Sequence, residues 1–480
     1  MKHRESDHSH HRRLKAVRCL WMAVALHLGG SAVNAAPLSL HPENPHYFLF
    51  RGRPTVLITS GEHYGAVVNL DFDGRQYLRT LEKDHLNLTR VFAGAYVEPV
   101  GAFNIARNTL APGPGRFLCP WARSTVAGYA NGGNKFDLSQ WDPGYFKRLR
   151  TFLRDANARG IVVELNLFCP FYEENIWALS PMNAANNING IGNIARTNVY
   201  TLDRSGSLLE IQEKLVRKLV TELRDFDNLY YEICNEPYFG GVTLEWQRHI
   251  AQLITQTESR WSRRHLISQN IANNKATVEN PDPNVSIFNF HYASPPDAVE
   301  MNYHLNKVIG ENETGFQGTE NAHYRKEAWQ FVLAGGGLFN NLDYSFVAGH
   351  EHGDFSYPKS QPGGGNPVYR LQLRHLHQFI HRFDFLRMKP HRDIVKSGLP
   401  AKARVYALSE PGKQYALYLF GGHEVTLELD IAPGDYQVEW LDPVTGKRTR
   451  SPNLKHSSGQ GPARLVSPSY TEDVALRISR

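Results

Sequence analysis

Apolar residues along the chain follow two different spacings. From residue 47 to about residue 346, short unbroken apolar runs alternate with stretches in which apolar residues recur at helical spacing. Unbroken runs are typical of parallel strands that are covered on both faces. The runs lie at residues 55–58, 86–92, 161–168, 229–234, 265–268, 285–290, 307–309 and 337–339.

Helical patterns fill the intervals between these runs. Residues 145–157 place four apolar side chains on one helical face, and Gly160 can end that helix. Residues 208–226 predict another helix, opened by Ser207-Leu-Leu-Glu210, whose spacing fits a capping box. About eight strand–helix units predict an α/β fold of the closed (β/α)8 TIM-barrel type. An open doubly wound sheet is the alternative, but no glycine-rich dinucleotide fingerprint follows the first run.

The last 90 residues have a different period. A helix over residues 368–387 is expected to complete the barrel, and residues 389–400 resemble a linker. Apolar and polar residues then alternate from Val425 to Ile431, and residues 442–446 have the composition of a hairpin turn. This period of two predicts a small antiparallel β-sandwich. The expected organisation is a barrel over residues 36–390 followed by a sandwich over residues 391–480.

The first 35 residues have the pattern of a signal peptide. A basic start through Arg18 leads into the apolar run 19–26, and small residues precede a cleavage site near Ala35. The run is shorter than the ~18 residues that a membrane span needs, and no later stretch reaches that length. We therefore expect export to a bacterial periplasm or beyond, and no membrane association after signal removal. An uncleaved N-terminal anchor is the alternative.

Charge and cysteine content exclude several classes of partner. The chain carries a net charge of +6, but its first 35 residues contribute +4, so the expected mature protein is nearly balanced and gives no argument for nucleic acid. Outside the signal the cysteines are Cys119, Cys169 and Cys234, whose odd number and spacing argue against a disulfide framework or a zinc site. A single bridge between Cys119 and Cys169 remains open.

The most specific motif is Tyr231-Glu-Ile-Cys-Asn-Glu-Pro237, in which the fourth apolar run ends in two polar residues and a proline. Active sites of barrels form at the carboxyl ends of strands. Asn-Glu-Pro at this position resembles the retaining glycoside hydrolases of clan A, which include the family 5 cellulases and mannanases. The resemblance implies that Glu236 is the general acid/base and that Asn235 binds the sugar 2-hydroxyl. On a surface turn the same tripeptide would carry no function.

A retaining mechanism needs a second carboxylate about 5–5.5 Å from the first. The resemblance places it at the end of the seventh strand, where Glu311 and Glu313 are available. Glu313-Thr-Gly315 fits the clan form of glutamate, any residue, glycine, so Glu313 is the expected nucleophile. Glu311 has the same strand parity, so both side chains could face inward. Glu311 therefore remains an alternative nucleophile or a substrate-binding group.

Other matches to the clan are weaker. Arg90 in the second run resembles the arginine beside the nucleophile, where a fixed cation favours an ionised carboxylate. His291 and Tyr292 resemble the histidine and tyrosine of the sixth strand. The usual form, however, is histidine, any residue, tyrosine, so either Tyr292 serves that role or no residue does. The clan histidine that ends the third strand is missing, and Asn166 is the candidate replacement.

Two further strand ends carry candidate substrate-binding groups. Glu62, His63 and Tyr64 follow the first run, and Asp343 follows the eighth, where many family 5 enzymes have a tryptophan. That departure leaves the substrate class open, and the chain resembles a cellulase-like subgroup with a C-terminal sandwich. The motif His350-Glu-His352 lacks a third ligand, so we expect no metal and no cofactor.

The sequence thus favours a secreted retaining glycoside hydrolase that cleaves O-glycosidic bonds of a poly- or oligosaccharide by double displacement. One alternative is a non-catalytic carbohydrate-binding protein, which would bind sugar without releasing reducing ends. Another is a transglycosylase, whose products would exceed the substrate in length. The sequence does not identify the sugar, the linkage, endo or exo action, or the oligomeric state.

Overall fold

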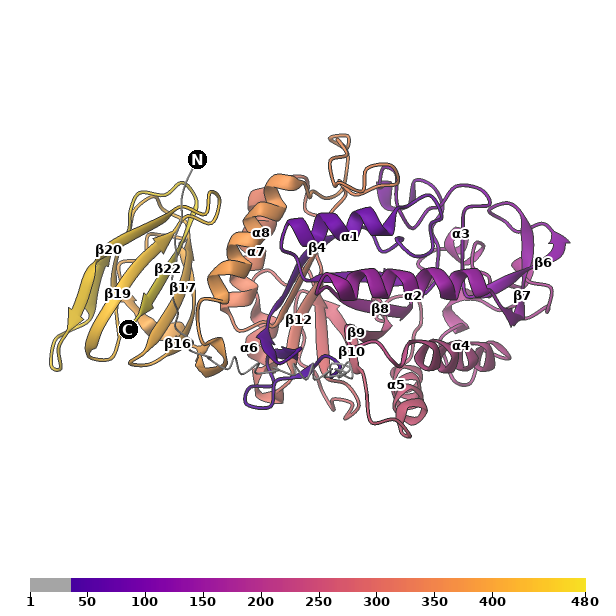
Figure 1. The fold of residues 1–480 in the computed structure, drawn as a ribbon, viewed down its shortest axis with the longest axis horizontal. Helices are drawn as coiled ribbons and strands as arrows, with labels where there is room; N and C mark the ends of the chain where they lie inside the picture. The colour runs from indigo at the N-terminus through magenta and orange to yellow at the C-terminus, as the bar shows by residue number, and fades with distance from the viewer. Residues whose placement is uncertain (1–35) are drawn as a thin grey trace, which may run out of the picture. The chain divides into compact units, whose positions relative to one another are not determined.

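The computed structural model describes residues 36–480 (Figure 1). The expected signal peptide therefore lies outside the described residues. Eight parallel strands form the central sheet, and every predicted apolar run contributes one of them, which confirms the barrel fold. The strands are β4 (Leu57–Gly61), β5 (Leu88–Phe92), β8 (Val162–Phe168), β9 (Leu229–Cys234), β10 (Leu266–Asn273), β11 (Ile287–His291), β12 (Val308–Glu313) and β13 (Leu338–Leu342).

The sheet curls until its edge strands meet. The strand order is β4-β13-β12-β11-β10-β9-β8-β5, which leaves β4 and β5 as the two edges. Asn87 joins them, because its backbone N–H donates to the Ile58 carbonyl at 3.3 Å and its side-chain oxygen accepts from the Ile58 N–H at 2.8 Å. The eight carboxyl ends therefore surround one opening, where side chains distant in sequence can meet.

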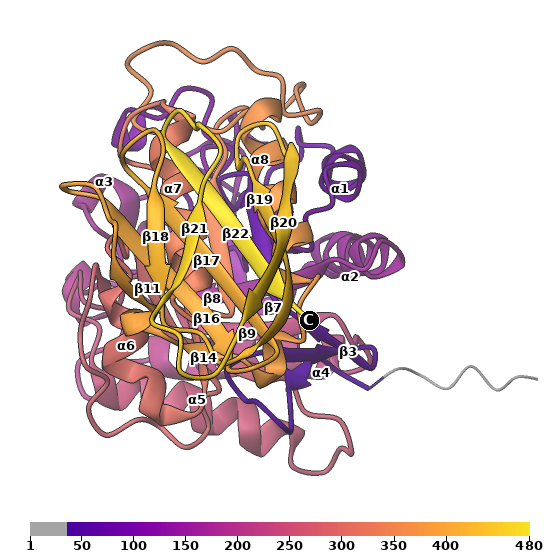
Figure 2. The ribbon, with the colours of Figure 1, turned by 90° about the vertical axis from the view of Figure 1, so that its left-hand side faces the viewer.

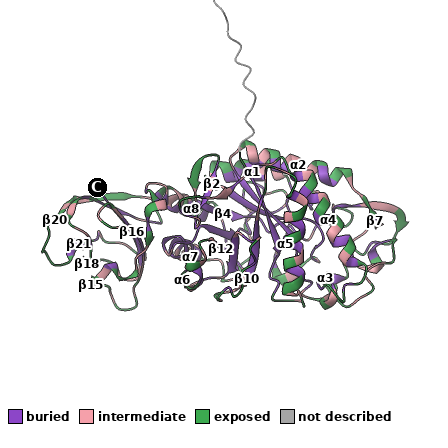
Figure 3. Cartoon of the chain, turned by 90° about the horizontal axis from the view of Figure 1, so that it is seen from below, coloured by how far each residue is buried: buried purple, intermediate pink, exposed green. Residues whose placement is uncertain are grey.

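Helices cover the outside of the barrel. Figure 3 shows buried strands at the centre, surrounded by helices whose outer faces are exposed. The expected helix after residue 145 is present, with Asp142 accepting hydrogen bonds from the first-turn N–H groups and Gly160 in the left-handed region at its end. The helices are α1 (Gly74–Lys83), α2 (Pro143–Ala158), α3 (Glu174–Trp177), α4 (Leu208–Leu223), α5 (Leu244–Glu258), α6 (Asp297–Asn302), α7 (Asn321–Leu333) and α8 (Pro367–Ile380).

Three local predictions were wrong. The expected linker over residues 389–400 instead contributes short strands to both sheets of the C-terminal region, at residues 389–390 and 395–397. Ser207 does not form a capping box, because its backbone is itself helical (φ −69°, ψ −5°) and its side chain makes no cap hydrogen bond. The carboxylate of Glu210 pairs with Lys214 at 2.6 Å instead. Helix α8 ends at Ile380, short of the expected residue 387. The chain turns after Ile380 and packs Phe385 edge-on against Tyr47, with ring centroids 4.9 Å apart.

The C-terminal region is a sandwich of two antiparallel sheets, as predicted (Figure 2). The apolar members of the alternation, at every second position from Val425 to Ile431, belong to its core. A hairpin turn at residues 442–446 joins β19 to β20. Tyr436 and Trp440 are buried core residues and offer no exposed aromatic platform. One sheet contains β14 (Lys389–Pro390), β16 (Arg404–Glu410), β17 (Gln414–Phe420), β22 (Asp473–Ser479), β19 (Gly434–Leu441) and β20 (Arg448–His456); the other contains β15 (Val395–Ser397), β18 (Thr426–Leu429) and β21 (Ala463–Val466).

Helix α7 of the barrel makes one of the contacts with this sandwich. Arg325 is buried and pairs with Asp473 at 2.9 Å and with Glu472 at 2.7 Å. One turn further along, Trp329 stacks on Tyr418 with ring centroids 5.3 Å apart. A buried ion pair and an aromatic stack hold helix α7 against the sheet.

Two small sheets complete the fold. A three-stranded antiparallel sheet of β1 (Ser39–Leu40), β2 (Phe48–Phe50) and β3 (Arg53–Thr55) precedes the barrel, and β6 (Trp121–Ala127) pairs with β7 (Asn134–Trp141) in the long connection after β5. Cys119, Cys169 and Cys234 are buried free thiols, so the bridge considered between the first two is not formed. In residues 36–480, no helix combines the length and apolarity that a membrane crossing requires.

Candidate active site

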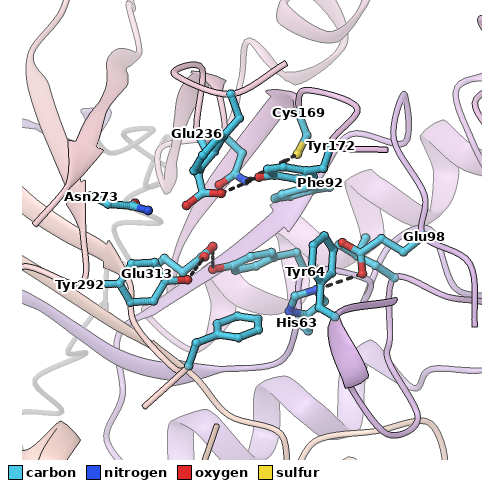
Figure 4. Close-up of a pocket in the computed structure, with 15 residues that line it drawn as sticks. His63, Tyr64, Phe92, Glu98, Cys169, Tyr172, Glu236, Asn273, Tyr292 and Glu313 are labelled. Atoms are coloured by element: carbon cyan, nitrogen blue, oxygen red, sulfur yellow. Dashed lines mark hydrogen bonds and ion pairs between the residues drawn. The ribbon is translucent and has the colours of Figure 1, made fainter. Parts of the chain in front are cut away.

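A pocket of about 320 Å³ opens at the carboxyl ends of the barrel strands (Figure 4). All of its lining residues belong to the barrel region, and none belongs to the sandwich. It is rich in aromatic rings and carboxylates, which is a composition suited to hydroxylated ligands with apolar faces. The lining residues are His63, Tyr64, Phe92, Glu98, Phe103, Leu110, Cys169, Tyr172, Asn235, Glu236, Phe239, Asn273, Tyr292, Glu313 and Phe316.

Glu236 enters the pocket just after strand β9. Its φ of +34° lies in the left-handed region, which a glutamate rarely adopts and which marks a locally constrained backbone. Its Oε2 accepts a hydrogen bond from the Tyr172 hydroxyl at 2.7 Å, and its Oε1 lies 3.0 Å from Nδ1 of His291. Tyr238 also points its hydroxyl at Oε1, at 3.3 Å. Both carboxyl oxygens are therefore held in place.

Glu313 enters the pocket from the end of strand β12. The Tyr64 hydroxyl donates to its Oε2 and the Tyr292 hydroxyl to its Oε1, both at 2.8 Å, and Arg90 donates to Oε2 at 3.2 Å. Burial alone would raise the pKa of Glu313, but His291, Arg90 and the two hydroxyls outweigh it, so the pKa lies below its usual value. Glu313 is therefore ionised at neutral pH.

The two carboxylates face each other across a short gap. An oxygen of Glu236, an oxygen of Glu313 and a ring nitrogen of His291 all lie within 4.8 Å of one another. The histidine stands between them, because its Nδ1 is 3.0 Å from Glu236 and 3.5 Å from Glu313. In inverting glycosidases a water molecule fits between one carboxylate and the sugar, and the two carboxyl groups stand about 6.5–9.5 Å apart. In retaining glycosidases one carboxylate attacks the sugar directly, and the separation is about 5–5.5 Å. The observed gap belongs to the shorter class.

The same three groups have the spacing of a metal site, but their surroundings suit a cation poorly. Both oxygens of Glu313 already accept hydrogen bonds from tyrosine hydroxyls, and the Arg90 guanidinium stands 3.2 Å from one of them. A metal ion bound here would be repelled by that fixed positive charge. The donor set therefore fits a proton-transfer site better than a metal site.

Arg90 is held by a carboxylate from the barrel interior. Its Nε and Nη2 donate to Glu232 at 2.8 and 2.5 Å, and the side chain has almost no exposed surface. Nη2 also donates to the side-chain oxygen of Asn235 at 2.7 Å, while the Asn235 amide donates to the Tyr172 hydroxyl at 2.8 Å. One chain of hydrogen bonds therefore joins Glu313, through Arg90, Asn235 and Tyr172, to Glu236.

The structure does not bring Glu311 into the pocket. In the pairing of β11 with β12, Phe290 is opposite Glu311 but His291 is opposite Glu313, so Asn312 is an extra residue on β12. A bulge of this kind changes the face on which the following side chains emerge. The expectation that equal strand parity turns both glutamates inward is therefore wrong.

The carboxyl of Glu311 lies between the sheet and helix α7. It accepts the backbone N–H of Ala293 at 2.7 Å and shares a hydrogen bond with Glu327. Burial, reinforced by the neighbouring Glu327 carboxylate, raises the pKa of Glu311 well above its usual value. A neutral carboxyl away from the pocket can neither attack nor bind a substrate there.

Glu62 and Asp343 are also structural instead of substrate-binding. Glu62 accepts hydrogen bonds from the Gly65 and Ala66 N–H groups and from the Thr109 hydroxyl at 2.6 Å, and burial raises its pKa to about 7. Asp343 pairs with Arg370 at 2.8 Å and accepts hydrogen bonds from two serine hydroxyls. Neither side chain lines the pocket.

Residues from loops complete the site, and the sequence pattern did not single them out. Tyr172 follows strand β8 by four residues and takes the place at the third strand for which Asn166 was the candidate. The Asn166 amide is buried and has no hydrogen-bond partner among the described residues. Glu98 comes from the long loop after β5 and pairs with His63 at 3.3 Å. The rule that barrel sites form at strand ends could have found Tyr172, whereas no signal in the sequence points to Glu98.

Comparisons with known proteins support the fold. No protein-family model matches the chain, and no curated protein matches it in sequence. Among solved structures, one described as a glycoside hydrolase has a TM-score of 0.64 at 15% identity, covering 92% of this chain and 97% of its own. A putative glycoside hydrolase from Bacteroides vulgatus has a TM-score of 0.65 at 14% identity, covering 93% and 82%. A family 5 glycoside hydrolase from the same organism has a TM-score of 0.62 at 14% identity, covering 92% and 93%.

At this level of identity the likeness concerns architecture. The similarity extends over more than nine tenths of this chain, so it includes both the barrel and the C-terminal sandwich. The comparisons therefore define a fold that this chain shares with glycoside hydrolase structures, one of which belongs to family 5. The assignment of chemistry depends on the site itself.

Proposed function

We propose that the protein is a secreted retaining glycoside hydrolase that cleaves O-glycosidic bonds of a poly- or oligosaccharide by double displacement. The observation that carries the proposal is the pair of facing carboxylates within 4.8 Å, of which Glu313 is held ionised by Arg90 and two tyrosines. Glu236 is the acid/base and Glu313 the nucleophile in this proposal. The secretion part is based on the sequence of residues 1–35 alone.

In the first step the Glu313 carboxylate attacks the anomeric carbon of the bound sugar. The bond from that carbon to the glycosidic oxygen breaks, and Glu236 gives its proton to this oxygen, so the rest of the substrate leaves as an alcohol. A covalent ester of Glu313 with the sugar remains. Tyr172 and His291 hold the two oxygens of Glu236, which keeps its proton aimed at one position.

In the second step Glu236, now a carboxylate, removes a proton from a water molecule. The water oxygen attacks the anomeric carbon, and the bond to Glu313 breaks, so the sugar leaves with the configuration it had at the start. Arg90, Tyr64 and Tyr292 bind the Glu313 carboxylate as its negative charge returns. Two inversions at one carbon give net retention.

The test is a screen of the purified protein against aryl glycosides of both anomeric configurations and against plant and bacterial polysaccharides. We expect turnover of at least one substrate, with a first product whose anomeric configuration, read by proton NMR, is that of the substrate. Glu236→Gln should lower kcat by about 10³-fold or more for substrates with a poor leaving group. The loss should be much smaller for dinitrophenyl glycosides, whose leaving group needs no proton.

The matched control is Glu258→Gln. Glu258 is another buried glutamate beside a histidine, His265 at 2.6 Å, but it lies outside the pocket and should leave kcat unchanged. An inverted product would exclude the double displacement. Sugar binding without turnover, unaffected by Glu236→Gln, would favour the carbohydrate-binding alternative, and products longer than the substrate would favour the transglycosylase.

A further inference from the structure

The pocket contains a third carboxylate, Glu98, for which the two displacement steps have no use. It lines the pocket with 4% of its surface exposed. Its Oε1 accepts from the Tyr96 hydroxyl at 3.0 Å, and its Oε2 accepts from Asn108 and lies 3.3 Å from Nε2 of His63. A carboxylate offers about four acceptor positions. Three are filled by the protein, and the group still borders the pocket.

His63 is the cationic partner of this carboxylate. Burial alone would lower the pKa of His63, but the charge of Glu98 and the hydrogen bond to it outweigh burial, so the pKa is raised. Both side chains are buried, and the hydrogen bond between them fixes how the Glu98 carboxyl is oriented. Neutral hydroxyl groups are the ligands that suit a buried, oriented carboxylate of this kind.

The loop that carries Glu98 is fastened to the segment after strand β4. Glu62 accepts the Thr109 hydroxyl at 2.6 Å, and the Thr109 hydroxyl also points at the His63 carbonyl at 2.9 Å. Gly65 allows the close approach, because a Cβ there would stand 2.2 Å from the Thr109 carbonyl oxygen. The Glu98 N–H donates to the Leu110 carbonyl at 2.9 Å and closes the base of the loop.

The far side of the same loop reaches across the pocket. Phe103, which is 36% exposed, meets Tyr172 edge-on with ring centroids 5.5 Å apart, and Tyr172 holds Glu236. The backbone of Ala106 is bound by Gln361 from the loop after β13. The loop of residues 98–110 is thus attached on three sides and forms a fixed wall.

The wall stands beside the sugar that Glu313 would attack. The Tyr64 hydroxyl binds Glu313, and the Tyr64 ring stacks on His63 with centroids 5.3 Å apart, so the His63–Glu98 pair is one aromatic ring away from the nucleophile. In the view of Figure 4, His63 and Glu98 lie at one end of the pocket, whereas Asn273 and Tyr292 lie at the other. A sugar whose anomeric carbon reaches Glu313, the glycone, would therefore contact Tyr64 and lie one ring away from the His63–Glu98 pair.

We propose that Glu98 binds hydroxyl groups of the glycone, and that the loop of residues 98–110 closes that end of the pocket so that single sugars are released from chain ends. The inference builds on the proposed function and adds its mode of attack. Glu98 is a specificity-determining residue in this scheme.

The first test compares Glu98→Gln with the wild type on the best aryl glycoside and on its monodeoxy analogues. Loss of a hydrogen bond to a charged group costs about 10- to 100-fold in kcat/KM. We expect that loss on the parent sugar, and less than about threefold loss on the analogue that lacks the hydroxyl bound by Glu98. An equal loss on every analogue, or no loss on any, would overturn the assignment.

The second test does not need turnover. Calorimetric titration with piperidine iminosugars of gluco, manno and galacto configuration should show binding of at least one by the wild type, weakened about 10-fold or more in Glu98→Gln but unchanged in Glu258→Gln. Binding that depends on Glu98 without hydrolysis of any substrate would refute the proposed function and leave this inference standing. If Glu98→Gln changes neither hydrolysis nor iminosugar binding, the proposed function stands and this inference is refuted. If the wild type neither hydrolyses a substrate nor binds an iminosugar, both are refuted.

Analysis of the reaction products tests whether the loop of residues 98–110 closes one end of the pocket. An oligosaccharide labelled at its reducing end should lose one sugar at a time from the other end, so monosaccharide is the only early unlabelled product. Phe103→Ala removes an exposed ring from the wall and should allow longer early products without loss of folding. A ladder of internal cleavage products from the wild type would contradict the closed pocket.

Discussion

Glu311 and Glu313 are separated by one residue on the same strand, yet they differ in nearly every physical respect. Glu313 reaches the pocket and accepts hydrogen bonds from two tyrosines and an arginine, so its pKa is lowered. Glu311 lies under helix α7, where burial and the neighbouring Glu327 carboxyl raise its pKa. Both are almost fully buried. Burial acts to raise the pKa of both glutamates, and the donors around Glu313 make the difference between them.

The difference depends on a single extra residue in the strand. With regular alternation the two side chains would share one face, and either both or neither would meet Glu236. The bulge at Asn312 separates them. Bulges are common beside active sites because they re-aim one side chain without moving the rest of the sheet.

The largest expected effect comes from removing the carboxylate that faces the pocket. Glu313→Ala should lower kcat by about 10³- to 10⁵-fold on the best aryl glycoside, because no group remains to attack the anomeric carbon. Sodium azide should restore part of the rate by entering the space left by the side chain. The rescued product should be a glycosyl azide of inverted configuration by NMR. A variant that keeps near wild-type rates would refute the assignment of Glu313.

An intermediate effect is expected from the donors that distinguish Glu313 from Glu311. Tyr64→Phe and Tyr292→Phe each remove one hydroxyl that binds Glu313 at 2.8 Å, and each should lower kcat by about 10- to 100-fold. The pH below which kcat falls should also move upward, because a carboxylate with fewer donors takes up a proton more readily. An unchanged pH profile would mean that the hydroxyls act only in packing.

The smallest effect on activity should come from Glu311→Gln, which we expect to leave kcat/KM within about threefold of the wild type. Its effect on stability depends on pH. Since the pKa of Glu311 is raised in the folded state, the folded protein holds a proton that the unfolded chain loses above its ordinary pKa of about 4.3. The free energy of unfolding attributable to this group therefore falls as the pH rises above that value. Glu311→Gln should flatten the decline of Tm between pH 5 and pH 8.

Glu313 is expected to act in the opposite direction. Its pKa is lowered by folding, so its contribution to stability is present above pH 4.3 and is lost as the pH falls through the folded-state pKa. Thermal unfolding of Glu313→Gln should therefore depend less on pH below about 4.3, where Glu311→Gln should behave like the wild type. Identical pH dependence in the two variants would contradict the contrast between the two environments.

The sequence predicted the architecture better than the details of the pocket. Unbroken apolar runs located all eight strands, and the change to alternation located the sandwich, because both patterns depend on which faces are buried. The capping box at Ser207 was wrong, since a sequence motif does not fix the backbone angles of its first residue. The end of helix α8 was misplaced because an apolar pattern continues through a turn as readily as through a helix.

Within the pocket, too, some residues could be predicted from the sequence and others could not. Glu236, Arg90 and Tyr292 lie on or directly after barrel strands, and they were found because the motifs around them resemble those of clan A. The orientation of Glu311 was not, because a bulge leaves no mark in the order of apolar and polar residues. Glu98 and Tyr172 lie on loops, whose course depends on contacts distant in sequence. The catalytic roles themselves stay predictions.

The sandwich contacts helix α7 of the barrel, and this helix also contacts strand β12, which carries the proposed nucleophile. Helix α7 carries Arg325 and Trp329 on the side that meets the sandwich, and between them Glu327, which shares a hydrogen bond with Glu311 on β12. Deleting residues 391–480 would remove both carboxylates that pair with Arg325 and would expose the ring face of Trp329 that stacks on Tyr418. We therefore expect a protein without these residues to aggregate or to lose the position of Glu313. In this view the C-terminal sheets support the structure of the barrel and are not an independent module.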